Sequence, residues 1–273
     1  MRFIAFIIVF LTGGLLLYGT MDFPDWGDPH SPASVHLSSY YIEKAMDDTQ
    51  VPNLVTAVLA DYRGYDTMFE TAVIFCAGLA CLLLLRDYRR KQQRYYIHKP
   101  TGILLHVKDN DKIIKVGEEF AHIDRDYVPP DLVIKTVCRI LIPMIQIYAL
   151  YVVSHGDFSP GGGFQGGVIF GSSLILLAIS YDLKTLVARI KEKVLGVVAA
   201  AGVLVYAGIA ALCMLMGGEF LNYEVLAPLV WDPHHVRALG MLGVEIGVGL
   251  AVTAVMAVLY INIVSEGRHH EGL

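Results

Sequence analysis

Long apolar runs alternate with polar segments along the chain. A helix needs about 20 residues to cross the roughly 30 Å hydrocarbon core of a bilayer, where every backbone polar group must be bonded internally. The pattern therefore predicts an all-α integral membrane protein with about six transmembrane helices. The candidate spans are residues 3–20, 69–85, 131–153, 163–181, 195–216 and 238–264.

Two polar segments are expected to have structure of their own. Residues 52–63 form about three helical turns ended by Gly64, too short to span at about 1.5 Å per residue. They predict a short outer amphipathic helix, either on the membrane surface or within protein-lined space. The β-type runs 103–107 and 112–116 flank a four-residue turn and predict a small β-hairpin. The expected division is a two-helix region with an outer loop at 1–97, a cytoplasmic insert at 98–130 and a four-helix domain at 131–273.

The distribution of lysine and arginine predicts the orientation. Residues 86–130 contain ten basic residues, whereas residues 21–68 contain two. The loop after the fourth span contains four, and residues 217–237 contain one. Because positively charged loops stay on the cytoplasmic side, both termini are expected to be cytoplasmic in a multi-pass protein of the cytoplasmic (inner) membrane.

Composition supports a membrane protein and excludes several other classes. Of the 273 residues, 55% are hydrophobic and 17% are charged, against about 25% charged in soluble domains. The net charge of -5 disfavours a nucleic-acid partner. No phosphate-binding loop, dinucleotide fingerprint, CxxC cluster or nucleophile elbow is present. We expect no cofactor and no enzymatic activity of the chain by itself. The four cysteines, all within apolar runs, are interpreted as small buried hydrophobic residues.

Glu245 is the first candidate for chemistry, because it lies seven residues into the last apolar run. A carboxylate there costs several kcal/mol unless it is paired, hydrated or protonated, so an intramembrane acid is a functional candidate by default. The alternative is a protonated acid that is hydrogen-bonded to a neighbouring helix. Flanking glycines are compatible with a close neighbour or with a water-lined cavity.

Two basic residues in the third span share one helix face. Lys135 and Arg139 are spaced i,i+4. Lys135 is close enough to the start of the span to extend its ammonium group to the cytoplasmic interface. Arg139 lies deeper and needs an acidic or carbonyl partner, which makes it a candidate gate or counter-charge of an ion path. Lys135 is counted with it among the ion-path candidates.

Charged residues near the predicted outer face suggest a vestibule. Asp61, Arg63 and Asp66 either form such a vestibule or are ordinary surface pairs. His155 and Asp157 lie at the predicted outer mouth, where they can contact a cation. One histidine and one aspartate do not make a metal site, and none is predicted.

The segment that follows His155 and Asp157 is rich in glycine. Gly163, Gly167 and Gly171 repeat at every fourth position of the fourth span. Small residues at this spacing allow membrane helices to approach closely. Helix packing is therefore the favoured interpretation of these glycines.

Three longer motifs carry a family resemblance. NLVTAVLADYRGYDTMFET (53–71) resembles the C-terminal region of the large MrpA protein of Mrp-type Na+/H+ antiporters, and equally the small E-type (MbhE-like) protein of membrane-bound hydrogenases. HGDFSPGGGFQGGVIFGSSLILLAISYD (155–182) and VEIGVGLAV (244–252) resemble the MnhB or MrpB protein of the same antiporters. The large antiporter-like domain that normally precedes the first motif is missing, and the two regions are normally separate chains.

The resemblance implies a membrane subunit of a multisubunit module that translocates Na+ and H+. Its implied partners are other subunits of an Mrp-like module, together with a hydrogenase or another redox arm. Thr67 and Glu70 fit a helix-capping box, whereas the resemblance implies that Glu70 lines the ion route with Glu245. The alternatives are a purely structural scaffold with neutral acids and, less favoured, a free-standing channel.

Overall fold

The computed structural model describes residues 2–85, 94–98, 100–101, 104–107, 120–123, 132–229 and 235–265. The chain divides into two units, Met1–Asp48 and Thr49–Leu273. The first contains α1 (Arg2–Gly19), short helical turns at Thr20–Asp22 and Ala33–Leu37, and most of α2 (Ser38–Thr49). The apolar helix α1 occupies the first predicted span, whereas α2 was not expected from the sequence.

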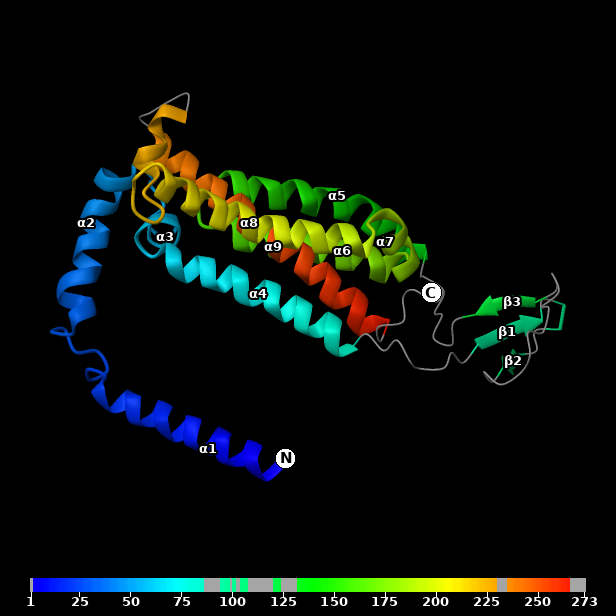
Figure 1. Cartoon of the computed structure of the whole chain (residues 1–273). Coiled ribbons are helices and arrows are strands. Elements are labelled where there is room, and N and C mark those ends of the chain that lie inside the picture. The colour runs from blue at the N-terminus through cyan, green and yellow to red at the C-terminus, as the bar shows by residue number, and fades with distance from the viewer. Residues whose placement is uncertain are drawn as a thin grey trace. The chain divides into compact units, whose positions relative to one another are not determined.

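The second unit contains helices that match the other five apolar runs (Figure 1). They are α4 (Gly64–Leu85), α5 (Leu132–Ser154), α6 (Gly163–Ser180), α8 (Glu192–Leu215) and α9 (Val236–Val264). Among the described residues, these five are long and apolar enough to cross a membrane. The chain is therefore a multi-pass membrane protein. Whether α1 is a sixth span stays a prediction.

Helix α9 is the centre of this bundle. It packs against α8, α6 and α4, while α5 covers the other side of α6. Sixteen of its 29 residues are buried, against three of 22 in α4. Glycines allow the close approach, because a Cβ on Gly247 of α9 would lie 2.8 Å from the carbonyl oxygen of Gly202 in α8.

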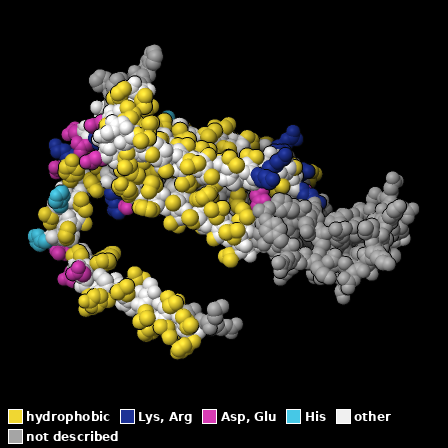
Figure 2. Space-filling model, in the orientation of Figure 1, with side chains coloured by type: hydrophobic (Ala, Val, Ile, Leu, Met, Phe, Trp, Pro, Cys, Tyr) yellow, Lys and Arg dark blue, Asp and Glu magenta, His cyan; other side chains and the backbone are white. Residues whose placement is uncertain are grey.

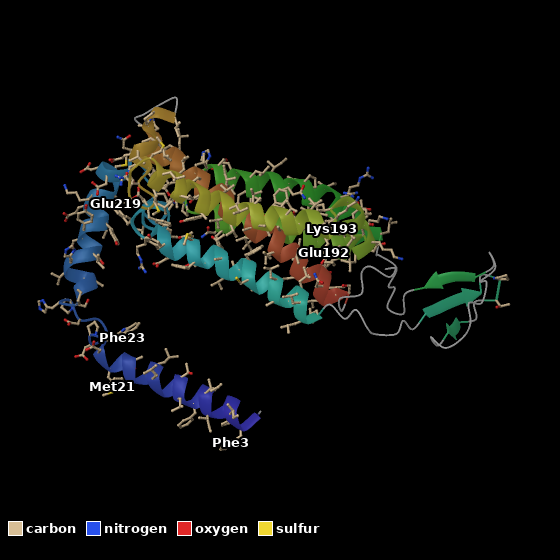
Figure 3. All side chains as sticks on the ribbon, in the orientation of Figure 1. Phe3, Met21, Phe23, Glu192, Lys193 and Glu219 are labelled. Atoms are coloured by element: carbon tan, nitrogen blue, oxygen red, sulfur yellow. The ribbon has the colours of Figure 1, made fainter. Side chains whose placement is uncertain are left out.

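The two ends of the bundle differ in their polar residues. At one end α4, α6 and α9 begin and α5 and α8 end, next to the 3₁₀ helix η4 (Tyr223–Leu229) (Figure 1). At the other end lies α7 (Leu183–Arg189), where Figure 2 shows Lys and Arg side chains gathered. Figure 3 shows Lys193 and Glu219 at these opposite ends.

The segment before α4 corrects two predictions. It forms α3 (Leu54–Ala57) and a π-helical stretch, η3 (Val58–Tyr62), as expected of a short helix. Gly64, however, begins α4. The capping box is wrong as well, since Thr67 lies inside α4 and its hydroxyl donates to Leu59 O at 2.8 Å. Glu70 is thus in the second turn of a helix.

A small antiparallel sheet combines two strands of the predicted insert with one strand that begins before it. β1 (Arg94–His98) pairs with both β2 (Leu104–Val107) and β3 (Phe120–Ile123), in the order β2-β1-β3. The predicted strand 103–107 is present, but its described partner is β1 and not residues 112–116, which lie outside the described residues. The predicted boundary at residue 97 falls within β1.

The cysteines correct one further expectation. Cys138 and Cys213 are buried and Cys81 is half-buried, but Cys76 is exposed on α4. This fits the small buried fraction of α4 and leaves one face of that helix open in the isolated chain.

Candidate ion site

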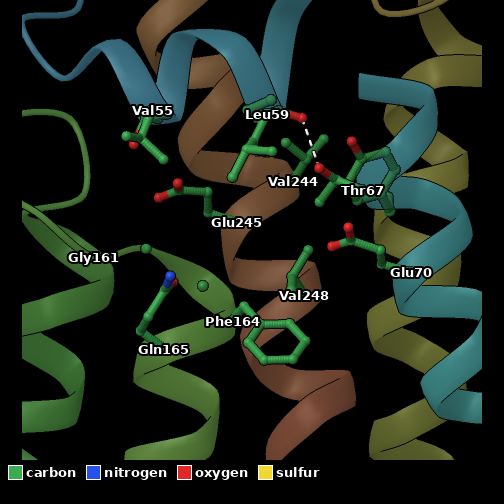
Figure 4. Close-up of a pocket in the computed structure, with 15 residues that line it drawn as sticks. Val55, Leu59, Thr67, Glu70, Gly161, Phe164, Gln165, Val244, Glu245 and Val248 are labelled. Atoms are coloured by element: carbon green, nitrogen blue, oxygen red, sulfur yellow. Dashed lines mark hydrogen bonds between the residues drawn. The ribbon is translucent and has the colours of Figure 1, made fainter. Parts of the chain in front are cut away.

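A cavity of about 190 Å³ lies where α3, η3, α4, α6, α8 and α9 meet (Figure 4). It brings together the two acids predicted for the ion path, Glu70 from α4 and Glu245 from α9. Apolar side chains from η3 and α9 make up much of the wall, including Leu59, Val244 and Val248. The other polar side chains that line it are Thr56, Thr67, Gln165 and Tyr206.

Glu245 is enclosed by glycine backbone. The residue is 9% exposed, and its Oε2 is buried with no hydrogen-bond partner among the described residues. A Cβ on Gly162 would lie 2.6 Å from Oε1, and one on Gly156 would meet Oε2. The carboxylate therefore lies directly against the loop between α5 and α6. In Figure 4 it points from α9 toward Val55 and Gly161.

That loop is held by α3. Asn53 caps α3 by accepting a hydrogen bond from Val55 N at 3.1 Å. Its amide nitrogen donates to Gly156 O at 2.7 Å and to Ser159 O at 2.8 Å. The Thr56 hydroxyl also donates to Gly156 O, at 2.8 Å. The glycine loop around Glu245 is thus fixed by two side chains from a region about 100 residues earlier in the chain.

Glu70 differs from Glu245 in its exposure. It is exposed in the isolated chain, and in Figure 4 it points into the cavity from α4. The start of α4, six residues before Glu70, is held by the buried Tyr206 hydroxyl, which donates to Gly64 O at 2.7 Å. The cavity therefore has one buried acid and one acid at its edge.

Three of the predicted vestibule residues take part in ion pairs. Arg63 pairs with Asp66 on the surface. Asp61 pairs with Arg237, Nε to Oδ2 at 3.1 Å, and Arg237 also reaches Glu224 at 3.5 Å. The contacts of Arg237 link η3 to the start of α9 and to η4.

The other two predicted vestibule residues, His155 and Asp157, lie in the loop between α5 and α6. His155 stacks on Tyr151 with 4.5 Å between ring centroids. Asp157 is half-buried, its Oδ1 has no hydrogen-bond partner among the described residues, and burial raises the pKa of its carboxyl group. Asp157 directly follows Gly156, where a Cβ would meet Glu245 Oε2, so it stands next to the loop position that contacts the carboxylate.

Lys135 and Arg139 are not part of the cavity. They lie three and seven residues from the start of α5, which ends at the loop near Glu245. At about 1.5 Å per residue they are more than 20 Å from that end along the axis. Both are exposed, and the Lys135 ammonium lies 5.0 Å from the centroid of the Tyr181 ring. Their role in an ion path stays a prediction.

The glycine repeat of α6 lies against α9. A Cβ on Gly163 would meet the backbone of Glu245, and one on Gly167 would lie 2.8 Å from Gly249 O. A Cβ on Gly171 would lie 3.1 Å from Met256 Cβ. These contacts fix the height of α6 beside Glu245.

Several residues of the site were not singled out in the sequence. Asn53, Thr56, Gln165 and Tyr206 are uncharged, and their importance arises only from contacts between distant segments. Arg237 carried a usable signal, because it is the only basic residue in residues 217–237. Among the described residues, no group of three or more His, Cys, Asp or Glu side chains is arranged to hold a metal ion.

Comparison with known proteins is consistent with this architecture. A family described as "Domain related to MnhB subunit of Na+/H+ antiporter" matches residues 133–258. The antiporter subunit mnhB2 of Staphylococcus epidermidis is 32% identical over 145 residues, which are 50% of this chain and 96% of that protein. The chain belongs to the MnhB family. A second family, MbhE, named for the E-type component of MBH, matches residues 26–100, so both resemblances seen in the motifs are confirmed.

Part of the chain also matches a much larger protein. A K(+)/H(+) antiporter protein of the combined A/B type, from Rhizobium meliloti, is 27% identical over 164 residues. These are 59% of this chain but only 15% of that protein, so the chain spans a small part of that relative. The cavity of this chain lies between the two matched regions. Thr56 and Glu70 come from the MbhE-like region, and Gln165 and Glu245 come from the MnhB-like domain.

Two solved structures share the fold. A chain of the archaeal membrane-bound sulfane sulfur reductase matches with a TM-score of 0.58 at 21% identity, covering 96% of this chain and 97% of that one. A chain of the Mrp complex from Dietzia sp. DQ12-45-1b matches with a TM-score of 0.56 at 25% identity. That match covers 93% of this MnhB-family chain and 24% of the Dietzia chain.

Proposed function

We propose that this membrane subunit of a multisubunit ion-translocating module contributes Glu245 and Glu70 to a path for Na+ and H+. The observation that carries the proposal is the shared cavity: the two acids come from separate family regions, yet both line it. Membership of the MnhB family supports Na+ and H+ as the transported ions. The chain itself is proposed to hold no cofactor and to catalyse no reaction.

The chemistry of such a site is competition for a carboxylate. A largely buried acid is costly as a bare anion, so its favoured states are protonated or cation-bound. Glu245 is 9% exposed with one unpartnered oxygen among the described residues, whereas Glu70 is exposed at the edge of the cavity. Exchange of Na+ for H+ at Glu245, with transfer through Glu70, is the proposed elementary event.

Partners and orientation follow from the same proposal. Chains with this fold occur in Mrp and respiratory membrane complexes, and we place this chain among other membrane subunits of such a complex in the cytoplasmic membrane. Both termini are proposed to be cytoplasmic, with the cavity at the outer end. An impermeant thiol reagent added to intact cells should therefore label Glu219→Cys and not Lys193→Cys. The opposite labelling pattern would reverse this topology.

The test replaces each acid in the complete complex. Glu245→Gln and Glu70→Gln keep size while removing charge, and we expect normal assembly with a loss of Na+-dependent pH change of at least about tenfold in everted vesicles. Glu245→Asp is expected to retain part of the activity. Glu219→Gln is the matched control, because Glu219 is exposed at the same end of the bundle outside the cavity.

A scaffold role is the second candidate, and the inter-region contacts favour it. Asn53, Tyr206 and Tyr223 each bond a backbone carbonyl of a distant segment, which ties the two family regions into the single firm unit that a scaffold requires. If Glu245→Gln and Glu70→Gln both exchange ions at the wild-type rate, the acids are packing groups. The scaffold role would then replace the ion path.

A further inference from the structure

Asp157 lies in the loop between α5 and α6, the Glu245 carboxylate lies against that loop, and each acid has an unsatisfied oxygen. Glu245 Oε2 and Asp157 Oδ1 are buried and have no hydrogen-bond partner among the described residues. Glu245 is more than nine-tenths buried, and a Cβ on Gly156, the residue before Asp157, would meet its Oε2. A buried carboxylate beside a half-buried one is destabilising unless one of them is protonated or a positive charge lies between them.

The side-chain hydrogen-bond donors next to these carboxylates, Asn53 and Thr56, are uncharged. The Asn53 amide donates to Gly156 O, Ser159 O and the Thr56 hydroxyl. The Thr56 side chain is within hydrogen-bonding reach of the Glu245 carboxylate and donates to Gly156 O, but it is neutral and brings no positive charge. The side chains that hold the loop therefore do not neutralise the carboxylates.

The neighbouring basic groups are also engaged with other partners. Arg237 pairs with Asp61 and Glu224, and Arg63 pairs with Asp66. The side chains described as lining the cavity include no Lys, Arg or His. The compensating charge at Glu245 and Asp157 must then come from a proton or from a bound cation.

We propose that Asp157 and Glu245 together bind one monovalent cation of the size of Na+. This inference rests on the proposed ion path and names its binding site. Hard cations take oxygen ligands, and the pair offers Glu245 Oε2 and Asp157 Oδ1, with the remaining ligands from water in the adjoining cavity of about 190 Å³. Two carboxylates suit an ion that must be released again, whereas dedicated sites for divalent ions use more protein ligands.

The glycines of the loop explain why the Glu245 carboxylate can approach the segment that carries Asp157. Because Gly156 and Gly162 have no side chains, the Glu245 carboxylate lies against the loop that carries Asp157. Gly161 has φ +131°, which only glycine adopts without strain, and it turns the chain at this point. A side chain at Gly156 or Gly162 would occupy the place of the carboxylate and separate the two acids.

The test measures cation binding separately from transport. A hydrophobic carbodiimide modifies buried carboxyl groups only when they are protonated, and mass spectrometry quantifies its adduct on Glu245 in the purified complex. At constant ionic strength, NaCl in place of choline chloride is expected to protect Glu245. Asp157→Asn should raise the Na+ concentration for half-protection, and the apparent KM for Na+ in exchange, by about tenfold or more. Asp157 Oδ1 makes no hydrogen bond in the described chain, so this variant is expected to assemble.

Glu219→Gln is the matched control, because Glu219 is an exposed acid at the same end of the bundle that does not line the cavity, and both of its values should stay unchanged. Protection that is unaltered in Asp157→Asn, or no protection by Na+ in the wild type, would overturn the two-carboxylate site. If that happens while Glu245→Gln abolishes exchange, only the site is refuted. Wild-type exchange by Glu245→Gln refutes the ion path instead.

Discussion

Replacing Asn53 by aspartate separates its two roles at the site. The side-chain oxygen caps α3 by accepting from Val55 N, and the amide nitrogen holds the glycine loop through Gly156 O and Ser159 O. Aspartate keeps the oxygen that caps the helix. It has no donor for the two carbonyls, and its charge repels them.

The expected magnitude follows from the bonds that are lost. Each hydrogen bond contributes about 0.5–1.5 kcal/mol, and a buried carbonyl left without a donor costs about 1–3 kcal/mol. Gly156 O keeps the Thr56 hydroxyl as a donor, so the larger penalty applies to Ser159 O. A total of about 2–3 kcal/mol corresponds to opening of the loop that is about 30-fold to 150-fold more frequent.

Hydrogen exchange of the intact complex measures this directly. Peptides that cover residues 153–165 should exchange about 30-fold to 150-fold faster in Asn53→Asp, while those covering α3 change little. Asn222→Asp is the matched control, because the Asn222 side chain also caps a backbone N–H, that of Glu224, at 3.2 Å. If loop exchange in Asn53→Asp equals that of the wild type, the amide does not hold the loop.

Two further predictions concern helix packing and pH. Gly167→Leu should reduce the yield of assembled complex by separating α6 from α9, at a cost of about 1–3 kcal/mol or more, since even a Cβ would lie 2.8 Å from the backbone there. Gly208→Ala should leave the yield unchanged, because a Cβ at Gly208 has nothing within 4 Å. A fully assembled but transport-dead Gly167→Leu complex would contradict the packing role. Burial raises the pKa of Asp157 above its ordinary 3.8, so the folded state holds this proton more tightly than the unfolded state. Stability measured without Na+ should then fall as pH rises from about 3.8 through the raised pKa, and a wild-type pH profile that matches that of Asp157→Asn would refute this.

The helices were predictable because the bilayer imposes a length. Each of α5, α6, α8 and α9 begins and ends within three residues of the predicted span. The start of α4 was missed because residues 64–68 are largely polar and do not extend the apolar run. The Thr67 hydroxyl bonds to Leu59 O, a contact with the preceding helical segment that sequence spacing alone does not reveal.

The site was predictable only where a residue conflicts with its surroundings. Glu245 stood out as an acid within an apolar run, and the structure places it in the cavity. Asn53 carried no signal of its own in the sequence, because its importance depends on carbonyls about 100 positions later. Strand β2 was located correctly, but its partner β1 lies within a basic stretch that showed no clear strand pattern.

The cavity cannot be assembled from either family region alone. The MnhB-like region supplies Glu245 and the glycine loop, while the MbhE-like region supplies Glu70 and the side chains that fix the loop. If these regions were separate chains, each site would depend on their association at cellular concentration. Within one chain their association is intramolecular, which raises the effective concentration of each region at the other. Joining the regions therefore ensures that every copy of Glu245 has its loop, its anchor and the second acid.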